Sequence, residues 1–336
     1  MAKSAAHHPQ LPLKTRISLF FLSAVTDATM RPDGTVNRRL FSTLTYLLRV
    51  PPSPSKPRHG VTTSDVPVDP SRGLWFRLFV PRDSSGSLPV IVFFHGGGFV
   101  YLSPDFKAYD DVCRRFAKAV PAAIVSVNYR LAPEHPYPAQ YDDGYDVLRF
   151  LEAERRRILP DTVDLSRCFL AGDSAGGNLA HHVALRAAQR AEPPGELRVV
   201  GVIAIQPFFG GEQVRKSEIE LEGVGFVVNS ARTQFMWNAL MPRADRDHEV
   251  INVSGPNAVD ISSIRFPATM VVVAGFDSLK DWQMSYYNWL VESGKEAYLV
   301  NYPNMFHAFY IFPELPESTL LISEVKNFIY KLSNST

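Results

Sequence analysis

The sequence predicts an α/β protein with a mostly parallel central sheet flanked by helices. Strand-like and helix-like segments alternate from residue 74 onward, which is the pattern of a parallel sheet covered on both faces. Several of the strand-like segments are continuous apolar runs, as expected of strands buried on both sides. A Gly-x-Ser-x-Gly pattern, Gly172 to Gly176, stands between one such strand and a helix. This is the place where the pattern forms a sharp turn that exposes a serine.

The elements follow one another in a simple order. Residues 1–50 are expected to be helical with apolar faces, and the proline-rich residues 51–70 to be a connector. The strand-like segments are residues 74–81, 89–97, 122–130, 167–171, 199–209, 268–277 and 297–303. The helix-like segments are residues 105–120, 140–157, the stretch after Gly176, 282–293 and 317–332. Residues 210–255 interrupt the alternation and are expected to form a lid insertion in a single domain spanning residues 1–336.

Composition narrows the function classes. The chain has 336 residues, of which 46% are hydrophobic and 21% charged, as in an ordinary globular protein. Its net charge of +1 gives no indication of a nucleic acid or membrane partner. Cys113 and Cys168 form no CxxC pair and are expected to be buried thiols in a reducing compartment. The apolar run 17–25 is too short to span a bilayer and is expected to belong to the mature N-terminal region.

Ser174 is the candidate nucleophile, and it needs a base and a group that orients the base. Asp277 ends the apolar run 268–277, and His307 lies in the loop between the next strand and the last helix. Both therefore stand after strands, where active sites of such sheets form. Their order, Ser174, Asp277, His307, is the order of a serine hydrolase triad on an α/β sheet. Taken singly, Asp277 could be a helix N-cap and His307 a structural histidine.

A tetrahedral intermediate carries a negative oxygen, and preorganised backbone N–H groups must point at it. The glycines of HGGG, residues 95–98, follow a buried strand and carry no side chains that would block this approach. We therefore expect Gly97, Gly98 and Ala175 to form an oxyanion hole, with His95 holding the loop. No phosphate-binding pattern follows these glycines. No metal site is expected either, since His181 and His182 are neighbours on a helix and point apart.

Aromatic residues near the site loops suggest an apolar, aromatic ligand. Phe99, Phe208 and Phe306 adjoin these loops and are candidate substrate-binding residues, although aromatic side chains are core residues by default. Phe20 and Phe21 of the N-terminal segment are candidates of the same kind.

Five motifs together resemble one known family. HGGGF (95–99), SVNYRLAPEHPYPA (126–139) and GDSAGG (172–177) resemble the hormone-sensitive-lipase-like branch of the α/β-hydrolases. RPDGTVNRRL (31–40) and NMFHAFYIFPE (304–314) are similar to its plant carboxylesterase subfamily, which also includes gibberellin receptors. The resemblance implies the α/β-hydrolase fold with a helical lid, to which residues 1–50 contribute, and cytosolic esterases that need no cofactor. It also implies that Arg130 and Glu134 are structural.

These expectations combine into a serine carboxylesterase that acts through an acyl-enzyme on an ester of a small apolar or aromatic metabolite, as a monomer or homodimer. The alternatives are a hormone receptor, a dehydratase and a cyclase on the same fold. In the receptors of this family an aliphatic residue replaces the catalytic histidine, whereas this chain has His307. In the isoflavanone dehydratases threonine replaces the nucleophile, whereas this chain has Ser174.

Overall fold

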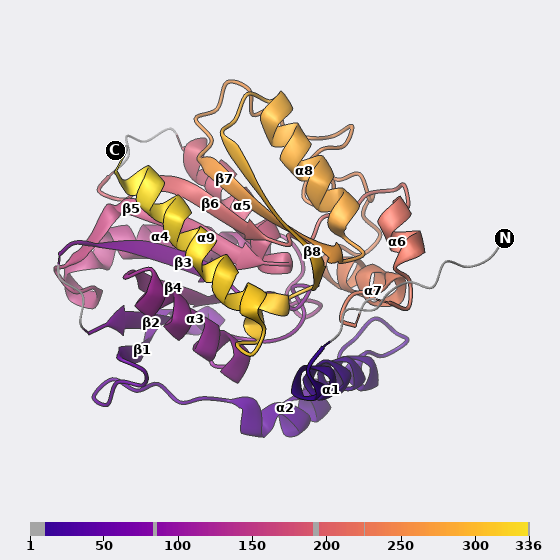
Figure 1. Cartoon of the computed structure of the whole chain (residues 1–336), viewed down its shortest axis with the longest axis horizontal. Helices are drawn as coiled ribbons and strands as arrows, with labels where there is room; N and C mark the ends of the chain where they lie inside the picture. The colour runs from indigo at the N-terminus through magenta and orange to yellow at the C-terminus, as the bar shows by residue number, and fades with distance from the viewer. Residues whose placement is uncertain (1–10, 83–85, 191–194, 225, 335–336) are drawn as a thin grey trace.

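The structure, a computed structural model, describes residues 11–82, 86–190, 195–224 and 226–334 and is built around one eight-stranded sheet (Figure 1). The strand order is β1-β2-β4-β3-β5-β6-β7-β8. The strands are β1 (Val61–Asp69), β2 (Leu74–Pro81), β3 (Leu88–Phe94), β4 (Ala123–Asn128), β5 (Val163–Asp173), β6 (Val199–Ile205), β7 (Ala268–Phe276) and β8 (Ala297–Phe306). β2 pairs antiparallel with both β1 and β4, and all other pairs are parallel. The predicted mostly parallel sheet is confirmed.

Helices cover both faces of this sheet. The α-helices are α1 (Leu13–Thr29), α2 (Arg38–Thr45), α3 (Lys107–Ala119), α4 (Ala139–Ile158), α5 (Ala175–Ala188), α6 (Lys216–Glu220), α7 (Ser230–Leu240), α8 (Lys280–Glu292) and α9 (Pro316–Ser333). Three short 3₁₀ turns are η1 (Tyr46–Leu48), η2 (Pro70–Arg72) and η3 (Phe309–Ile311). Helices α3 and α9 lie on the face nearer the viewer in Figure 1, and α4, α5 and α8 pack on the other. No helix in the described ranges is long and apolar enough to cross a membrane.

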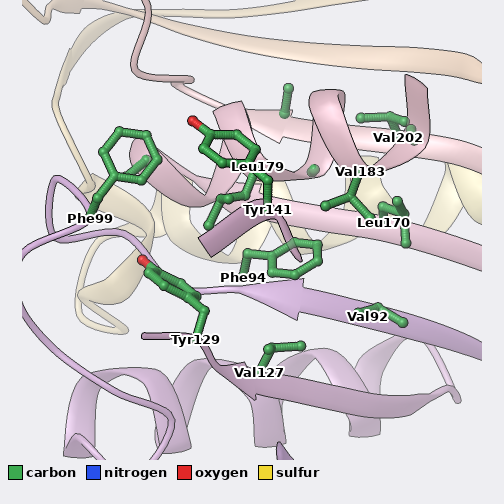
Figure 2. Close-up of a cluster of buried hydrophobic side chains, with 14 of the residues drawn as sticks. Val92, Phe94, Phe99, Val127, Tyr129, Tyr141, Leu170, Leu179, Val183 and Val202 are labelled. Carbon is green, nitrogen blue, oxygen red and sulfur yellow. The ribbon is translucent and has the colours of Figure 1, made fainter. Parts of the chain in front are cut away.

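The core has one layer on each side of the sheet. Figure 2 shows the layer beneath α4 and α5, where Phe94 of β3 and Leu170 of β5 meet Tyr141, Leu179 and Val183 of the helices. The opposite layer packs side chains of α3 and α9 against the other faces of the same strands. Burial on both faces explains the continuous apolar runs in the sequence. These layers hold the strand ends, and hence the loops after them, in fixed positions.

One expectation for the fold was wrong. Residues 51–70 were expected to be a connector, but Val61–Asp69 is the edge strand β1. Its polar residues and Pro67 hid it, because they interrupt the apolar signal of a strand. Pro67 is tolerated since an edge strand needs hydrogen bonds on one side only, and the register shifts just after it.

The N-terminal segment is fastened to the body by charged and polar contacts. Arg38 of α2 donates from Nε and Nη2 to the two carboxylate oxygens of Glu134 at 2.9 and 2.7 Å, and from Nη2 to the carbonyl of Ala132 at 2.6 Å. Thr29 at the end of α1 donates to the hydroxyl of Tyr101 at 3.2 Å. These contacts place α1 and α2 at the carboxyl-terminal edge of the sheet.

Candidate active site

Ser174 occupies a sharp turn between β5 and α5. Its backbone has φ 53° and ψ −120°, a conformation that costs a non-glycine residue of order 1–3 kcal/mol. The flanking glycines are sterically required. A Cβ on Gly172 would lie 2.3 Å from the Gly176 backbone, and a Cβ on Gly176 would lie 1.9 Å from the carbonyl oxygen of Phe94. The sequence G-D-S-A-G therefore lets β5 and α5 approach β3 closely enough to form the turn.

Asp277 and His307 come together as the sequence order suggests. His307 Nδ1 donates to Asp277 Oδ2 at 2.7 Å, and the Asp277 side chain is completely buried. Asp277 follows β7 and His307 follows β8, and these two strands pair in parallel. Because parallel strands end at the same edge, residues 30 positions apart meet in space. His307 and Ser174 line the same cavity.

The Asp277 carboxylate is held by two glutamines that the sequence analysis missed. Gln206 Nε2 and Gln283 Nε2 donate to Asp277 Oδ2 at 3.0 and 2.9 Å, and the backbone N–H of Leu279 donates to Oδ1 at 3.0 Å. Gln206 also accepts from the N–H of Ala308 at 2.8 Å, and so connects the carboxylate to the histidine loop. A polar residue directly after the apolar strand β6 was the available signal for Gln206.

The pKa of His307 reflects opposing effects. Burial by itself lowers this pKa, but the charge and hydrogen bond of Asp277 and the charge of Asp173 together raise it above 6.5. The carboxylate thus stabilises the imidazolium, which is what a base that accepts a proton requires. The Nδ1–H contact also leaves Nε2 as the nitrogen free to accept that proton.

The glycine loop after β3 is tied to the nucleophile turn by Asp173. The N–H of Gly96 donates to Asp173 Oδ1 at 2.9 Å and to the hydroxyl of Tyr109 at 2.8 Å, and that hydroxyl donates to Asp173 Oδ2 at 3.0 Å. Gly97 and Gly98 follow with φ of 103° and 62°, and both line the cavity. Among the described residues, no hydrogen bond occupies their amides. The loop therefore carries two uncommitted amide donors at the cavity that Ser174 also lines.

Two further groups brace this loop from inside the protein. His95 is fully buried, donates from Nδ1 to the carbonyl of Gly96 at 2.8 Å, and stacks on Tyr129 with ring centroids 4.3 Å apart. Burial lowers the pKa of His95 to about 4, so it is a neutral support at physiological pH. Burial also raises the pKa of Asp173 to about 6, although Tyr109, His307 and Gly96 favour its charged form.

A cavity of about 90 Å³ opens above these groups. Its walls are largely apolar and come from the glycine loop, the nucleophile turn, α1, the segment leading into α7, and the histidine loop. Its lining includes Gly97, Gly98, Asp173, Ser174, Phe208 and His307, with Leu22, Ser23, Thr26, Val227, Val228, Arg232 and Met236 above them. Residues of both expected lid segments, 1–50 and 210–255, thus face the site, while residues 1–10 and 225 lie outside the described residues.

The three aromatic candidates differ in position. Phe208 lines the cavity and stacks on Trp237, with ring centroids 4.4 Å apart. Phe99 is buried against Trp237 and Tyr141, and Phe306 is buried against Phe312; neither is among the described lining residues. Phe20 is 75% exposed and points to solvent. Phe208 is thus the one of these four aromatic residues that is among the described lining residues of the cavity.

Arg130 and Glu134 lie in structural ion pairs. Arg130 donates from Nε and Nη2 to the buried carboxylate of Asp143 at 2.9 Å, and Glu134 receives Arg38. Ala175, the third expected oxyanion donor, is the first residue of α5, where a helix leaves its amides without intrahelical acceptors. In the described part of the chain, no group of three or more His, Cys, Asp and Glu residues is arranged to hold a metal ion.

Known proteins share this architecture. A family model described as "alpha/beta hydrolase fold" matches residues 91–311. The gibberellin receptor GID1C of Arabidopsis thaliana is 36% identical over 95% of this chain and 94% of its own length. Carboxylesterase 20 of the same plant is 34% identical over 90% of this chain and 94% of its own.

A solved structure agrees. The hyperthermophilic esterase of the archaeon Pyrobaculum calidifontis superposes with a TM-score of 0.75 at 30% identity, covering 96% of this chain and 99% of that one. A shared fold does not fix one activity, because these relatives include both receptors and esterases. They do settle the family: this chain belongs to the α/β-hydrolases, among the relatives of plant carboxylesterases and gibberellin receptors.

Proposed function

We propose that this protein is a serine carboxylesterase that hydrolyses an ester of a small apolar or aromatic metabolite through an acyl-enzyme intermediate. The observation that carries the proposal is the buried contact of 2.7 Å between His307 Nδ1 and Asp277 Oδ2, in a cavity that His307 shares with Ser174. A buried carboxylate that raises the pKa of a histidine, in the same cavity as a strained serine, is the arrangement expected around an activated nucleophile.

In this mechanism Ser174 Oγ attacks the ester carbonyl while His307 Nε2 takes the hydroxyl proton. His307 then donates that proton to the departing alkoxide, which leaves the acyl group on Ser174. A water molecule, activated by the same nitrogen, hydrolyses the acyl-serine and restores the site. Asp277 keeps Nδ1 protonated and stabilises the imidazolium in both half-reactions.

The oxyanion is stabilised by backbone amides. The N–H groups of Gly97 and Gly98 lie on a loop fastened to the residue just before Ser174, so donors and nucleophile keep a constant relation. Ala175 N–H, at the start of α5, is the third donor, and the helix terminus adds a favourable field for negative charge. Such preorganised donors contribute about 10²–10³-fold each in related chemistry.

The decisive experiment measures hydrolysis of p-nitrophenyl acetate and p-nitrophenyl benzoate by the purified protein and by Ser174→Ala and His307→Ala. We expect each variant to lose on the order of 10⁴-fold or more of kcat, because triad members act as a unit. Ser42→Ala and His135→Ala remove the same groups from exposed positions and serve as controls. Turnover by Ser174→Ala at the wild-type rate would refute the assignment. No turnover by the wild type would favour a receptor instead.

A further inference from the structure

Among the described residues that line the cavity there is one arginine, and all of its N–H groups already donate hydrogen bonds to protein acceptors. Arg232 of α7 is 6% exposed and lines the cavity. Its Nε and Nη2 donate to the two carboxylate oxygens of Asp27, at 2.7 Å each. Its Nη1 donates to the carbonyls of Phe226 and Val227 at 3.2 and 2.9 Å. The geometry with Asp27 is the bidentate one that a bound carboxylate would otherwise take.

Arg232 also joins the two segments that form the roof of the cavity, which are α1 and the residues from 226 into α7. Ser23 of α1 accepts from Nη1 through its hydroxyl at 3.2 Å and from Nη2 through its carbonyl at 3.3 Å. Asp27 lies one helical turn further along α1. Ser23 and Asp27 lie 209 and 205 positions before Arg232 in the sequence. Their contacts with Arg232 therefore hold α1 against α7 and the segment before it.

The remaining charges along the wall do not favour an anion. Of the described lining residues, Arg232 is the one with a permanent positive charge, and its charge is balanced by Asp27. Asp173 is negative above a pKa of about 6, and it faces the same space. During reaction the ester carbonyl takes the amides of Gly97, Gly98 and Ala175, so a second carboxylate on the enclosed group would meet no uncommitted cation among the described lining residues. Burial of such an unpaired carboxylate is unfavourable.

We propose that the site selects esters whose acyl group, the part enclosed by the cavity, is uncharged, and that it rejects esters whose acyl group carries a carboxylate. Asp27 decides this preference, because it forms the bidentate ion pair with Arg232 that a substrate carboxylate would otherwise form. The proposal rests on the esterase function argued above and adds the charge of the substrate to it. Asp27 acts through Arg232 and is a specificity-determining, positioning residue. Its own side chain is 55% exposed, so it holds Arg232 from the outer side of the roof.

The test uses two esters of equal size, p-nitrophenyl 4-carbamoylbenzoate and p-nitrophenyl 4-carboxybenzoate, which differ only in a neutral amide against a carboxylate. We expect the wild type to prefer the amide by at least 100-fold in kcat/KM. Asp27→Asn keeps the size of the side chain and removes its charge, so the positive charge of Arg232 is no longer balanced by a carboxylate. In this variant the ratio of kcat/KM for the amide ester to that for the carboxylate ester should fall at least tenfold. Asp33→Asn removes the same charge from an exposed turn in the loop that follows α1 and should leave the preference unchanged.

Each outcome decides the proposal. Equal kcat/KM for the two esters in the wild type overturns it and leaves the esterase function standing, and this comparison needs no variant to fold. An unchanged preference in a folded Asp27→Asn protein overturns the role of Asp27. If neither ester nor p-nitrophenyl acetate is turned over, the esterase function fails. Binding of methyl 4-carbamoylbenzoate and methyl 4-carboxybenzoate, measured by equilibrium dialysis, then decides the charge preference: tenfold tighter binding of the carbamoyl ester supports it, and equal or absent binding overturns it.

Discussion

Replacing Gly97 by alanine tests whether the glycine loop stabilises the transition state. Gly97 has φ 103°, and its carbonyl accepts the amides of Val100 and Tyr101 at 3.1 and 3.0 Å, which closes a tight turn. An alanine Cβ at this position would lie 2.3 Å from the carbonyl oxygen of Tyr101 in the same turn. The obstacle is backbone, so no side chain can rotate away to relieve it.

The magnitude follows from the size of the clash. The distance of 2.3 Å falls about 1 Å short of an ordinary contact at 3.4 Å, and the loop must shift by that amount. Misplacement by about 1 Å costs on the order of 10²-fold in rate, and loss of one oxyanion donor costs about 10²–10³-fold. We therefore expect kcat to fall about 100- to 1000-fold. The unfavourable φ adds about 1–3 kcal/mol of destabilisation.

The assay is kcat and KM for p-nitrophenyl acetate, with urea unfolding measured in parallel. Gly73→Ala is the matched control, because Gly73 also has a positive φ, 64°, but a Cβ there meets no atom within 4 Å. It should lower the free energy of unfolding by about 1 kcal/mol and leave kcat unchanged. A folded Gly97→Ala protein that keeps more than about a tenth of the wild-type kcat would refute the reasoning, since the donors would then not matter at the level expected.

Three further predictions concern pH, a buried carboxylate and the N-terminal segment. Since the pKa of His307 is raised above 6.5 and its neutral form is the base, kcat/KM should fall as the pH drops through that pKa, and Asp277→Asn should move the midpoint of this pH profile lower; an unmoved midpoint would contradict the role of Asp277. The folded-state pKa of Asp173 is raised from 3.8 to about 6, so its protonated form stabilises the fold below pH 4 and this stability is lost as the pH rises through 6. The free energy of unfolding of Asp173→Asn, relative to that of the wild type, should therefore rise by up to ~3 kcal/mol from pH 4 to pH 8, as measured by urea unfolding at both pH values. A difference between the two proteins that does not change with pH would contradict this prediction. Deletion of residues 1–50 removes Arg38 from Glu134 and part of the cavity wall, and should lower kcat/KM at least tenfold, or prevent folding, whereas a fully active truncated protein would exclude the lid role.

Local signals were sufficient for much of the fold. The apolar runs of β3, β5, β6 and β7 are strands in the structure because each is buried on both faces, and burial is what such runs report. Edge strand β1 lacked that signal because most of its side chains are only partly buried or are exposed. Its polar residues and Pro67 therefore read as a connector.

The chemistry of the site was readable for a related reason. The turn has no room for a side chain at positions 172 and 176, so both must be glycine, and the two glycines are visible in the sequence. Asp277 and His307 follow consecutive strands, so topology alone indicated that they lie at the same edge. In the structure His307 Nδ1 and Asp277 Oδ2 are 2.7 Å apart, as that position at a common edge requires.

The sequence by itself indicated a mostly parallel sheet, most of its strands along the chain, and the positions of the candidate nucleophile, base and orienting carboxylate, because each depends on residues that are neighbours in the chain or on the order of elements along it. Only the tertiary structure decided which side chains enclose the cavity and how its charge is balanced. Arg232 and Asp27 are an example, since their partnership joins segments separated by 205 positions. Gln206, which connects Asp277 to the histidine loop, is another. Such contacts depend on packing between distant segments, and a local pattern of residue types carries no record of them.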